Sequence, residues 1–283
     1  MDRFRFGLPA GLTTAPLVRG LDRPEARKRV QLVAHADPSV IGRQLLDGEL
    51  DAALMAPQQA ADGSERLELI PGMAVTTRGN SGLAILHHRR GLGELRSIAC
   101  LGPADTAGML LKILFSSAGF CPDLTAWTGA SAGALDSCDG LLVAGDRALI
   151  ESPSPEYSRL DLGQAWTQLT GLPFVWLVGA ARPGVVDREL YGLLHTARAR
   201  GRRAWPALAR QFAQRHGTSE RHLVEIVEKA VVFRLGRPEL DGLLAFWEAA
   251  AQAGLLRPSN GPRFVPLSAG TFCRSWAESR RSG

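Results

Sequence analysis

The sequence predicts an α/β protein with two lobes and a helical section at its C-terminal end. Over about the first 55 residues, strand, helix, strand, helix and strand patterns follow one another, which is typical of a parallel sheet with right-handed crossovers. After two consecutive strands the alternation begins again at Ser97, and from Val186 onward only helical patterns follow. A chain of 283 residues has room for one large domain or two smaller lobes.

The first lobe opens with a strand at 3–8, where Phe4 and Phe6 alternate with arginines. A loop of small residues at 9–16 leads into a short helix through Leu21. Asp37 and Pro38 begin the next helix, because Asp is favoured at the N-cap and Pro at the first helical position. That helix is expected to end at 46, and the strands of this region are expected at 30–36, 50–55, 67–76 and 81–88.

The turn at 77–80, between the last two of these strands, is a candidate crossing into a second lobe. The expected strands of that lobe are 97–101, 125–128 and 140–143, and its expected helices are 106–117 and 131–135. The return crossing is expected at a helix beginning at Asp161 and the apolar run 174–178, a strand covered on both faces. We therefore expect residues 1–86 and 179–283 to form lobe I and residues 87–178 to form lobe II, with the ligand cleft between them.

The segment that begins at Asp161 is the most informative part of the chain. Asp161 can cap a short helix whose apolar stripe is Ala165, Trp166 and Leu169, and a Gly-Leu-Pro turn at 171–173 ends it. The C-terminal section is expected to contain helices at 186–199, 205–216, 219–233 and 238–253. A Pro/Ser loop is expected at 152–155, and the tail after Pro258 is expected to be loose.

Composition narrows the class of partner. The formal net charge of +5 mildly favours anionic ligands, but the arginines of the C-terminal helices lack the interleaved aromatic residues that stack on bases. We therefore expect no nucleic-acid partner. No apolar run is long enough to cross a bilayer, and the N-terminus shows no secretory signal, so we expect no membrane partner. The four cysteines lack metal or redox spacing, which favours free thiols and a cytoplasmic protein.

The chain shows no phosphate loop, dinucleotide fingerprint, nucleophile elbow or zinc spacing, and we expect neither a cofactor nor a metal. His87 and His88 do not change this expectation. Neighbouring side chains on a strand point to opposite faces, so the pair cannot easily share a metal ion. With Arg89 and Arg90 they are interpreted as a solvated hinge segment.

Two helix starts can bind an anion. Thr13 and Thr14 precede a helix that Pro16 would begin, where hydroxyls and free N–H groups can hold a carboxylate or simply cap the helix. The amides of Thr106 and Ala107 offer a similar site on the opposite lobe. Asp105 opposes this reading, because as an N-cap it would use the same amides.

Asp146 follows a strand at the edge of the sheet where open α/β folds bind ligands. Its carboxylate can orient a hydroxyl or transfer a proton there. The alternatives are an ion pair with Arg147 or a cap on the following turn.

Five segments, in order along almost the whole chain, resemble the futalosine-pathway menaquinone enzymes, chorismate dehydratase and its relative dihydroxynaphthoate synthase. They are Ala10-Gly-Leu-Thr-Thr-Ala-Pro-Leu17, Gly48-Glu-Leu-Asp-Ala-Ala53, Gly145-Asp-Arg-Ala-Leu149, the block 161–175 and Leu235-Gly-Arg-Pro-Glu-Leu-Asp-Gly-Leu-Leu-Ala-Phe246. The block 161–175, with its Trp and its Thr-Gly-Leu-Pro-Phe-Val ending, favours the dehydratase branch.

The resemblance implies a type II periplasmic-binding-protein-like fold and a lyase that eliminates water from chorismate to give 3-enolpyruvylbenzoate. It also implies a small carboxylate substrate and no cofactor, with the protein acting as a monomer or homodimer. Thr13 stands where the family has a loop asparagine, and Ala56 and Leu83 (or Ser81) stand where it has serines. We expect Thr13 and Asp146 to be catalytic. The expected substrate-binding residues are Thr14, Ala56, Ser81, Leu83, Thr106 and Ala107.

The pocket is less polar than the family pattern, which keeps two other functions open. One is a non-catalytic protein of the same fold that binds a small anion or aromatic acid. The other is the sister activity, dihydroxynaphthoate synthesis.

Overall fold

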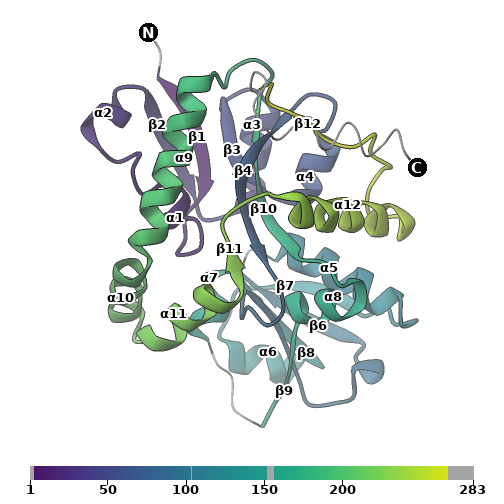
Figure 1. The fold of residues 1–283 in the computed structure, drawn as a ribbon. Coiled ribbons are helices and arrows are strands. Elements are labelled where there is room, and N and C mark those ends of the chain that lie inside the picture. The colour runs from purple at the N-terminus through teal and green to yellow at the C-terminus, as the bar shows by residue number, and fades with distance from the viewer. Residues whose placement is uncertain (1–2, 103, 152–155, 267–283) are drawn as a thin grey trace.

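The computed structural model describes residues 3–102, 104–151 and 156–266, and within them the strands form two sheets (Figure 1). The larger sheet has the order β11-β4-β10-β3-β1-β2, and β12 also pairs with β4. Its strands are β1 (Phe4–Pro9), β2 (Val30–His35), β3 (Ala52–Met55), β4 (Glu68–Thr77), β10 (Phe174–Ala181), β11 (Val231–Val232) and β12 (Arg263–Phe264). The first three strands pair in parallel, as the sequence predicts, and β10 runs antiparallel to both β3 and β4.

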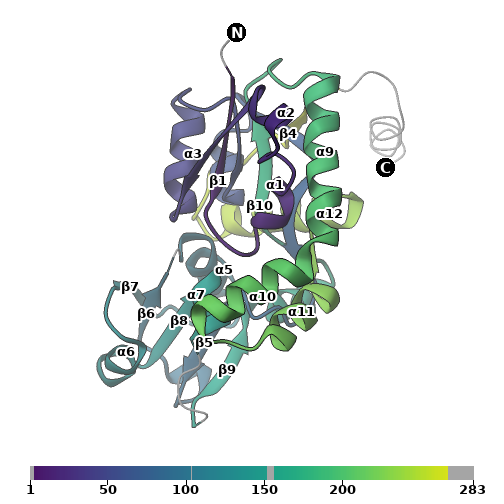
Figure 2. The same ribbon diagram turned by 90° about the vertical axis from the view of Figure 1, so that its left-hand side faces the viewer.

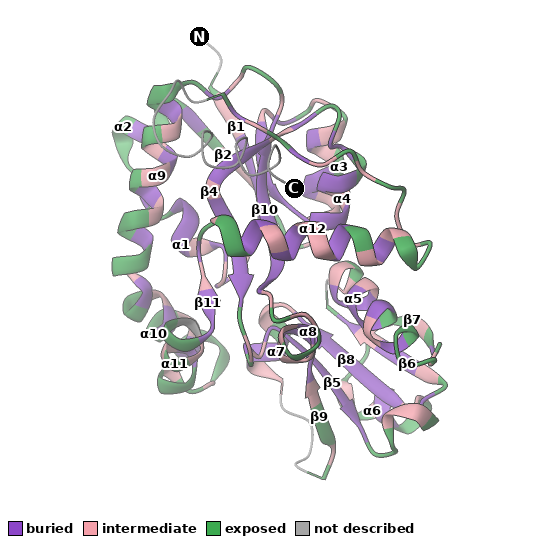
Figure 3. Cartoon of the chain, turned by 45° about the vertical axis from the view of Figure 1, so that its right-hand side comes forward, coloured by how far each residue is buried: buried purple, intermediate pink, exposed green. Residues whose placement is uncertain are grey.

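The smaller sheet has the order β7-β6-β8-β5-β9. Its strands are β5 (Ala84–His88), β6 (Ser97–Leu101), β7 (Asp123–Trp127), β8 (Gly140–Ala144) and β9 (Ser158–Asp161). β6 pairs in parallel with β7 and β8, whereas β5 runs antiparallel to β8 and β9. Each sheet carries its own helices, and the buried residues gather along the sheets and on the helix faces that cover them (Figure 3).

The helices of the N-terminal half are α1 (Ala15–Val18), α2 (Pro24–Arg27), α3 (Pro38–Leu46), α4 (Pro57–Asp62), the 3-10 helix η1 (Leu92–Glu94), α5 (Asp105–Ser116) and α6 (Ser131–Ser137). Those of the C-terminal half are α7 (Asp146–Ile150), α8 (Leu162–Thr170), α9 (Arg188–Arg203), α10 (Trp205–His216), α11 (Glu220–Lys229) and α12 (Arg237–Gln252). Helix α9 lies against α1, and α10 and α11 descend beside the smaller sheet (Figure 2). The hydroxyl of Thr218, between α10 and α11, donates to the carbonyl of Leu149. The C-terminal section therefore contacts both lobes.

Sheet membership shows where the chain crosses between lobes. β5 pairs within the smaller sheet and β10 within the larger one, so the crossings lie at 78–83 and 162–173. The expected lobe boundaries at 86/87 and 178/179 cut through these two strands. Periodicity identifies a buried strand, but it does not reveal which sheet the strand joins.

One buried carboxylate ties the two crossings together. Asp161 Oδ1 accepts the N–H of Gln164 at 2.8 Å, which confirms the predicted helix cap. Its Oδ2 accepts the N–H groups of Ser81 at 3.0 Å and Gly82 at 2.7 Å, in the other crossing. Burial raises the pKa of the Asp161 carboxyl, while these amide bonds oppose the rise. The same side chain therefore caps α8 and links the two crossings, which together form the hinge between the lobes.

The rest of the 161–175 block packs this hinge against α12. The Trp166 indole donates to the carbonyl of Pro173 at 3.3 Å and makes edge-to-face contacts with Phe174 and Phe246. Gly242 allows α12 to approach closely, because a Cβ there would lie 2.1 Å from the Pro173 carbonyl oxygen. The expected stripe is wrong at Leu169, which is 56% exposed, since α8 presents its Trp166 face to the core.

Three further expectations need correction. His87 and His88 are buried on β5, so the solvated hinge is wrong for the histidines. The helix expected at 219–233 ends at Lys229, and β11 follows because its residues pair with the end of β4. The tail after Pro258 is anchored at β12, which pairs with β4. The loop at 152–155 and the remainder of the tail lie outside the described residues.

Candidate active site between the lobes

A cavity of about 500 Å³ lies between the two sheets and is lined by both lobes. Lobe I contributes the loop after β1, the start of α3 and parts of β4 and β10. The other lobe contributes Leu83 in the crossing, the start of α5 and the turn from β8 into α7. Loops and helix starts at strand ends are where α/β folds place ligands, and a cavity of this size suits a small molecule.

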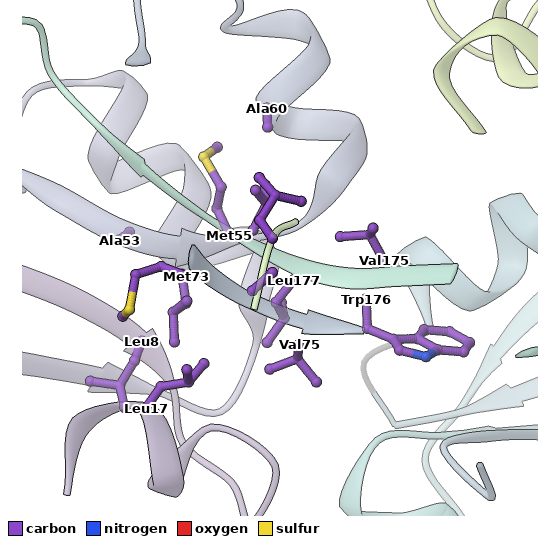
Figure 4. Packing of buried hydrophobic residues seen from close by; sticks show 14 of the residues in the cluster. Leu8, Leu17, Ala53, Met55, Ala60, Met73, Val75, Val175, Trp176 and Leu177 are labelled. Carbon is purple, nitrogen blue, oxygen red and sulfur yellow. The ribbon is translucent and has the colours of Figure 1, made fainter. Parts of the chain in front are cut away.

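One wall of the cavity is apolar. Val75 on β4 and Leu177 on β10 are paired in register and share a face, and Trp176 lies beside them on β10 (Figure 4). The Trp176 indole N–H donates to the Thr77 hydroxyl at 2.9 Å, so this N–H is not available to a ligand. The wall therefore offers hydrocarbon surface, which suits a flat ring.

The loop after β1 presents one unengaged hydroxyl. Thr14 is buried, and its hydroxyl donates to the carbonyls of Pro9 at 2.6 Å and Gly11 at 3.0 Å. Thr14 therefore stabilises the loop. Thr13 is less buried and lines the cavity, and its hydroxyl has no hydrogen-bond partner among the described residues. Of the two threonines, only Thr13 can offer a free hydroxyl to a ligand.

The start of α5 carries no side-chain cap. Its N-cap position is Ala104, and Asp105 is exposed, so the expected Asp105 cap is wrong. The Thr106 hydroxyl donates to Gln58 Oε1 of the other lobe at 3.0 Å. The first-turn amides of this 12-residue helix, with Thr106 and Ala107, therefore adjoin the cavity without an acidic cap.

Asp146 makes neither of the local contacts considered for it. Arg147 pairs with Glu151 at 2.9 Å. The Asp146 carboxylate instead accepts the N–H of Leu12, in lobe I, at 2.7 Å. Burial raises the pKa of this carboxyl, while the Leu12 N–H, the nearby His216 and the N–H of Thr13 oppose the rise. Asp146 thus spans the cleft.

Charge at the cavity is sparse among the lining residues. Among the described residues that line the cavity, Arg147 is the positively charged one, and its side chain is 47% exposed. Asp37 also lines the cavity, but its Oδ1 accepts the Ser39 N–H at 2.8 Å as the cap of α3. The arrangement can therefore bind an anion more readily than it can supply a free side-chain base.

The structure brings six of the eight predicted site residues together. They are Thr13, Thr14, Leu83, Thr106, Ala107 and Asp146. Ala56 is buried at the N-cap of α4, away from the cavity lining. Ser81 is fully buried in the crossing, where its N–H bonds Asp161 and its hydroxyl accepts the Leu83 N–H.

The sequence prediction missed Val75, Trp176, Leu177 and Arg147. Nothing in their local patterns separates them from ordinary core or surface residues. The available signal was the position of Trp176 directly after the 161–175 block.

Residues 3–102, 104–151 and 156–266 contain no group of three or more His, Cys, Asp or Glu side chains that could hold a metal ion. In the same ranges, no helix has both the length and the apolar character needed to cross a bilayer.

Sequence comparisons find a matching protein family and a similar enzyme. Residues 5–252 match the family described as menaquinone biosynthesis. The chorismate dehydratase of Thermus thermophilus is 30% identical over 268 residues, which cover 88% of this chain and 96% of that protein.

Solved structures confirm the periplasmic-binding-protein-like fold. A protein from Archaeoglobus fulgidus has a TM-score of 0.69 at 14% identity, and the match covers 90% of this chain and 98% of that one. The periplasmic aliphatic sulphonate binding protein of Escherichia coli has a TM-score of 0.62 at 12% identity, with 96% of each chain covered. A Candida albicans protein described as having the generic periplasmic binding protein fold has a TM-score of 0.60 at 10% identity, with 92% of each chain covered.

Proposed function

Since the chain belongs to the menaquinone biosynthesis family, we propose that it is a chorismate dehydratase. The observation that carries this proposal is the inter-lobe cavity, which joins an apolar wall to a free hydroxyl and an uncapped helix start. Chorismate has the matching parts: a six-membered cyclohexadiene ring, which becomes flat when it aromatises, a ring hydroxyl and two carboxylates. The cytoplasmic location and the monomer or homodimer state remain predictions.

The reaction removes one molecule of water from the ring. The hydroxyl leaves one ring carbon and a proton leaves the neighbouring carbon, whose C–H electron pair becomes a ring double bond. The product, 3-enolpyruvylbenzoate, is aromatic, which supplies the driving force. The elimination involves no net oxidation, so the demands on the protein are orientation, exclusion of water and stabilisation of the departing hydroxyl.

The lining residues divide these tasks. Val75, Trp176 and Leu177 hold the ring and keep water away from it. The first-turn amides of α5 and the Arg147 guanidinium bind a substrate carboxylate. The Thr13 hydroxyl donates to the departing oxygen. Since the lining carboxylates are already hydrogen-bonded, we propose that a carboxylate of the substrate takes the ring proton.

A second candidate function is a protein that binds a small aromatic acid without converting it. It is favoured because the carboxylates that line the cavity are already hydrogen-bonded and do not offer a free base. Leu83 supports this alternative, because it lines the cavity where the resembled family has a serine. A turnover assay separates the two functions.

The test is incubation of the purified protein with chorismate, with the product followed by liquid chromatography. Thr13→Ala should lower kcat by about 100- to 1,000-fold, the usual effect of losing one donor to a developing oxyanion, and Thr13→Ser should restore most of it. Thr125→Ala, at an exposed position on the edge strand β7, is the matched control. Binding of chorismate without product in the wild type would establish the binding protein instead.

A further inference from the structure

We propose that Asp146 is a positioning residue, which holds the two lobes closed and thereby sets the Thr13 hydroxyl in the cavity. Its role in turnover rests on the proposed function, whereas its role in closure does not. The turn at 145–146 and the loop at 11–13 are far apart in sequence and meet across the cleft.

The bonds of Asp146 run from one lobe to the other. Asp146 is the first residue of α7 in lobe II, and its carboxylate accepts the N–H of Leu12 in lobe I. This bond is 2.7 Å long, within the short range of bonds from an amide to an ionised acceptor. The neighbouring N–H of Thr13 also stabilises the carboxylate, so Asp146 fixes the backbone on both sides of the Leu12–Thr13 peptide, and Thr13 lines the cavity.

Two glycines allow this contact. Gly145 has φ of 69° and ψ of −149°, a region that is essentially restricted to glycine, and it turns β8 directly into α7. Its N–H donates to the carbonyl of Leu83 at 2.9 Å. On the other side, a Cβ at Gly11 would lie 3.0 and 3.2 Å from the Asp146 oxygens. Backbone geometry on both lobes thus leaves room for this one carboxylate.

The contact also forms a wall. A second cavity, of about 340 Å³, lies on the α10 side and shares Ala10, Gly11 and Asp146 with the first. Arg215 and His216 of α10 line this second cavity. If the Asp146 contact breaks, the loop that carries Thr13 loses its link to lobe II and the wall between the cavities is weakened. Closure and exclusion of water therefore both depend on this contact.

The competing role for Asp146 is direct proton transfer to or from the substrate. Gly11→Ala distinguishes the two roles, because its methyl group crowds the carboxylate, which must shift by a few tenths of an ångström, and no titratable group is removed. The φ of Gly11 is not positive, so alanine fits its backbone. Asp146→Asn is the complementary variant, because it keeps an oxygen acceptor for the amides but removes the exchangeable acid.

The experiment compares Asp146→Ala, Asp146→Asn and Gly11→Ala with the control Asp136→Ala, at an exposed position on α6. For a positioning role, Asp146→Ala should raise KM for chorismate by about 10- to 100-fold, as expected for a lost bond to a charged acceptor, and Gly11→Ala should raise it by a smaller factor. Asp146→Asn should raise KM less than Asp146→Ala does, since its amide oxygen still accepts but carries no charge. A kcat loss of more than 100-fold in Asp146→Asn, with normal kinetics in Gly11→Ala, would overturn the proposal in favour of proton transfer.

Small-angle X-ray scattering of the ligand-free proteins tests closure without any substrate. Asp146→Ala and Gly11→Ala should have a larger radius of gyration than the wild type and the control, with unchanged circular dichroism. Equal radii in all four would refute the closing role. If the wild type does not convert chorismate but these radii differ, the proposed reaction is wrong and the closing role stands.

Discussion

His87 provides a sharp test of the burial described above. It lies on β5 between Leu141 of β8 and Arg159 of β9, and only 1% of it is exposed. Neither ring nitrogen has a hydrogen-bond partner among the described residues. Burial, with smaller effects of Arg159 and His88, lowers the pKa of His87 from 6.5 to about 4. The folded protein therefore holds this imidazole neutral under conditions where the unfolded chain protonates it.

The sign and size of the pH effect follow from this difference. Below pH 6.5 the unfolded state binds the proton and the folded state does not, so stability falls as the pH falls toward 4. Linkage between these two pKa values gives a loss of about 2 kcal/mol between pH 7 and pH 5. His87→Leu removes the titration and fits the surrounding Ile85, Leu141 and Val143 cluster, so it should remove this part of the acid sensitivity.

The assay is urea denaturation of the wild type and His87→Leu at pH 7, 6 and 5, followed by far-ultraviolet circular dichroism. The difference in unfolding free energy between the two proteins should shift by about 2 kcal/mol in favour of the variant from pH 7 to pH 5. His222→Gln, at an exposed position on α11, serves as the control histidine. Parallel pH curves for the wild type and His87→Leu would refute the conclusion that a neutral, unpartnered imidazole is buried in β5.

Two further predictions concern the hinge. Gly242→Ala should destabilise the protein by about 3 kcal/mol or more, because its Cβ would lie 2.1 Å from a backbone oxygen of Pro173. Gly171→Ala should cost about 1 kcal/mol, since it meets no atom and only its φ of 72° is unfavourable. Thermal unfolding of both variants checks the order, and equal losses would contradict it. Asp161→Ala should lower stability by about 2 to 4 kcal/mol and increase hydrogen exchange at the Ser81 and Gly82 amides, whereas unchanged exchange there would show that Asp161 acts only as a helix cap.

The sequence predicted the elements with strong local signals. The first three strands, the Asp37 cap and the Asp161 cap occur where the patterns place them. Short elements were not predictable, because β9, β11 and β12 contain four, two and two residues and depend on pairing with distant strands. The prediction that His87 is exposed to solvent was wrong for a related reason. A polar residue on a strand is expected in solvent, and only the neighbouring β8 and β9 explain its burial.

The sequence predicted where the candidate site lies better than it predicted what each residue does there. Family motifs led to the loop at 10–17 and the turn at 145–149, both of which border the cavity. Thr14 stabilises the loop and Thr13 keeps its hydroxyl free, because it is the Thr14 hydroxyl that reaches the Pro9 carbonyl. The sequence cannot show which of two adjacent threonines makes this bond. The partner of Asp146 lies 134 residues away, and no local pattern encodes such a contact.

The position of β10 has a consequence for the order in which the protein forms on the ribosome. This strand, residues 174–181, lies between β3 and β4 in the larger sheet, whereas the strands of the smaller sheet all come from residues 84–161. During synthesis, all the strands of the smaller sheet therefore leave the ribosome before β10, the central strand of the larger sheet. Until β10 emerges, the facing edges of β3 and β4 are open to pairing with other chains. We expect the N-terminal third of this protein to be the part that chaperones must protect longest, although it is synthesised first.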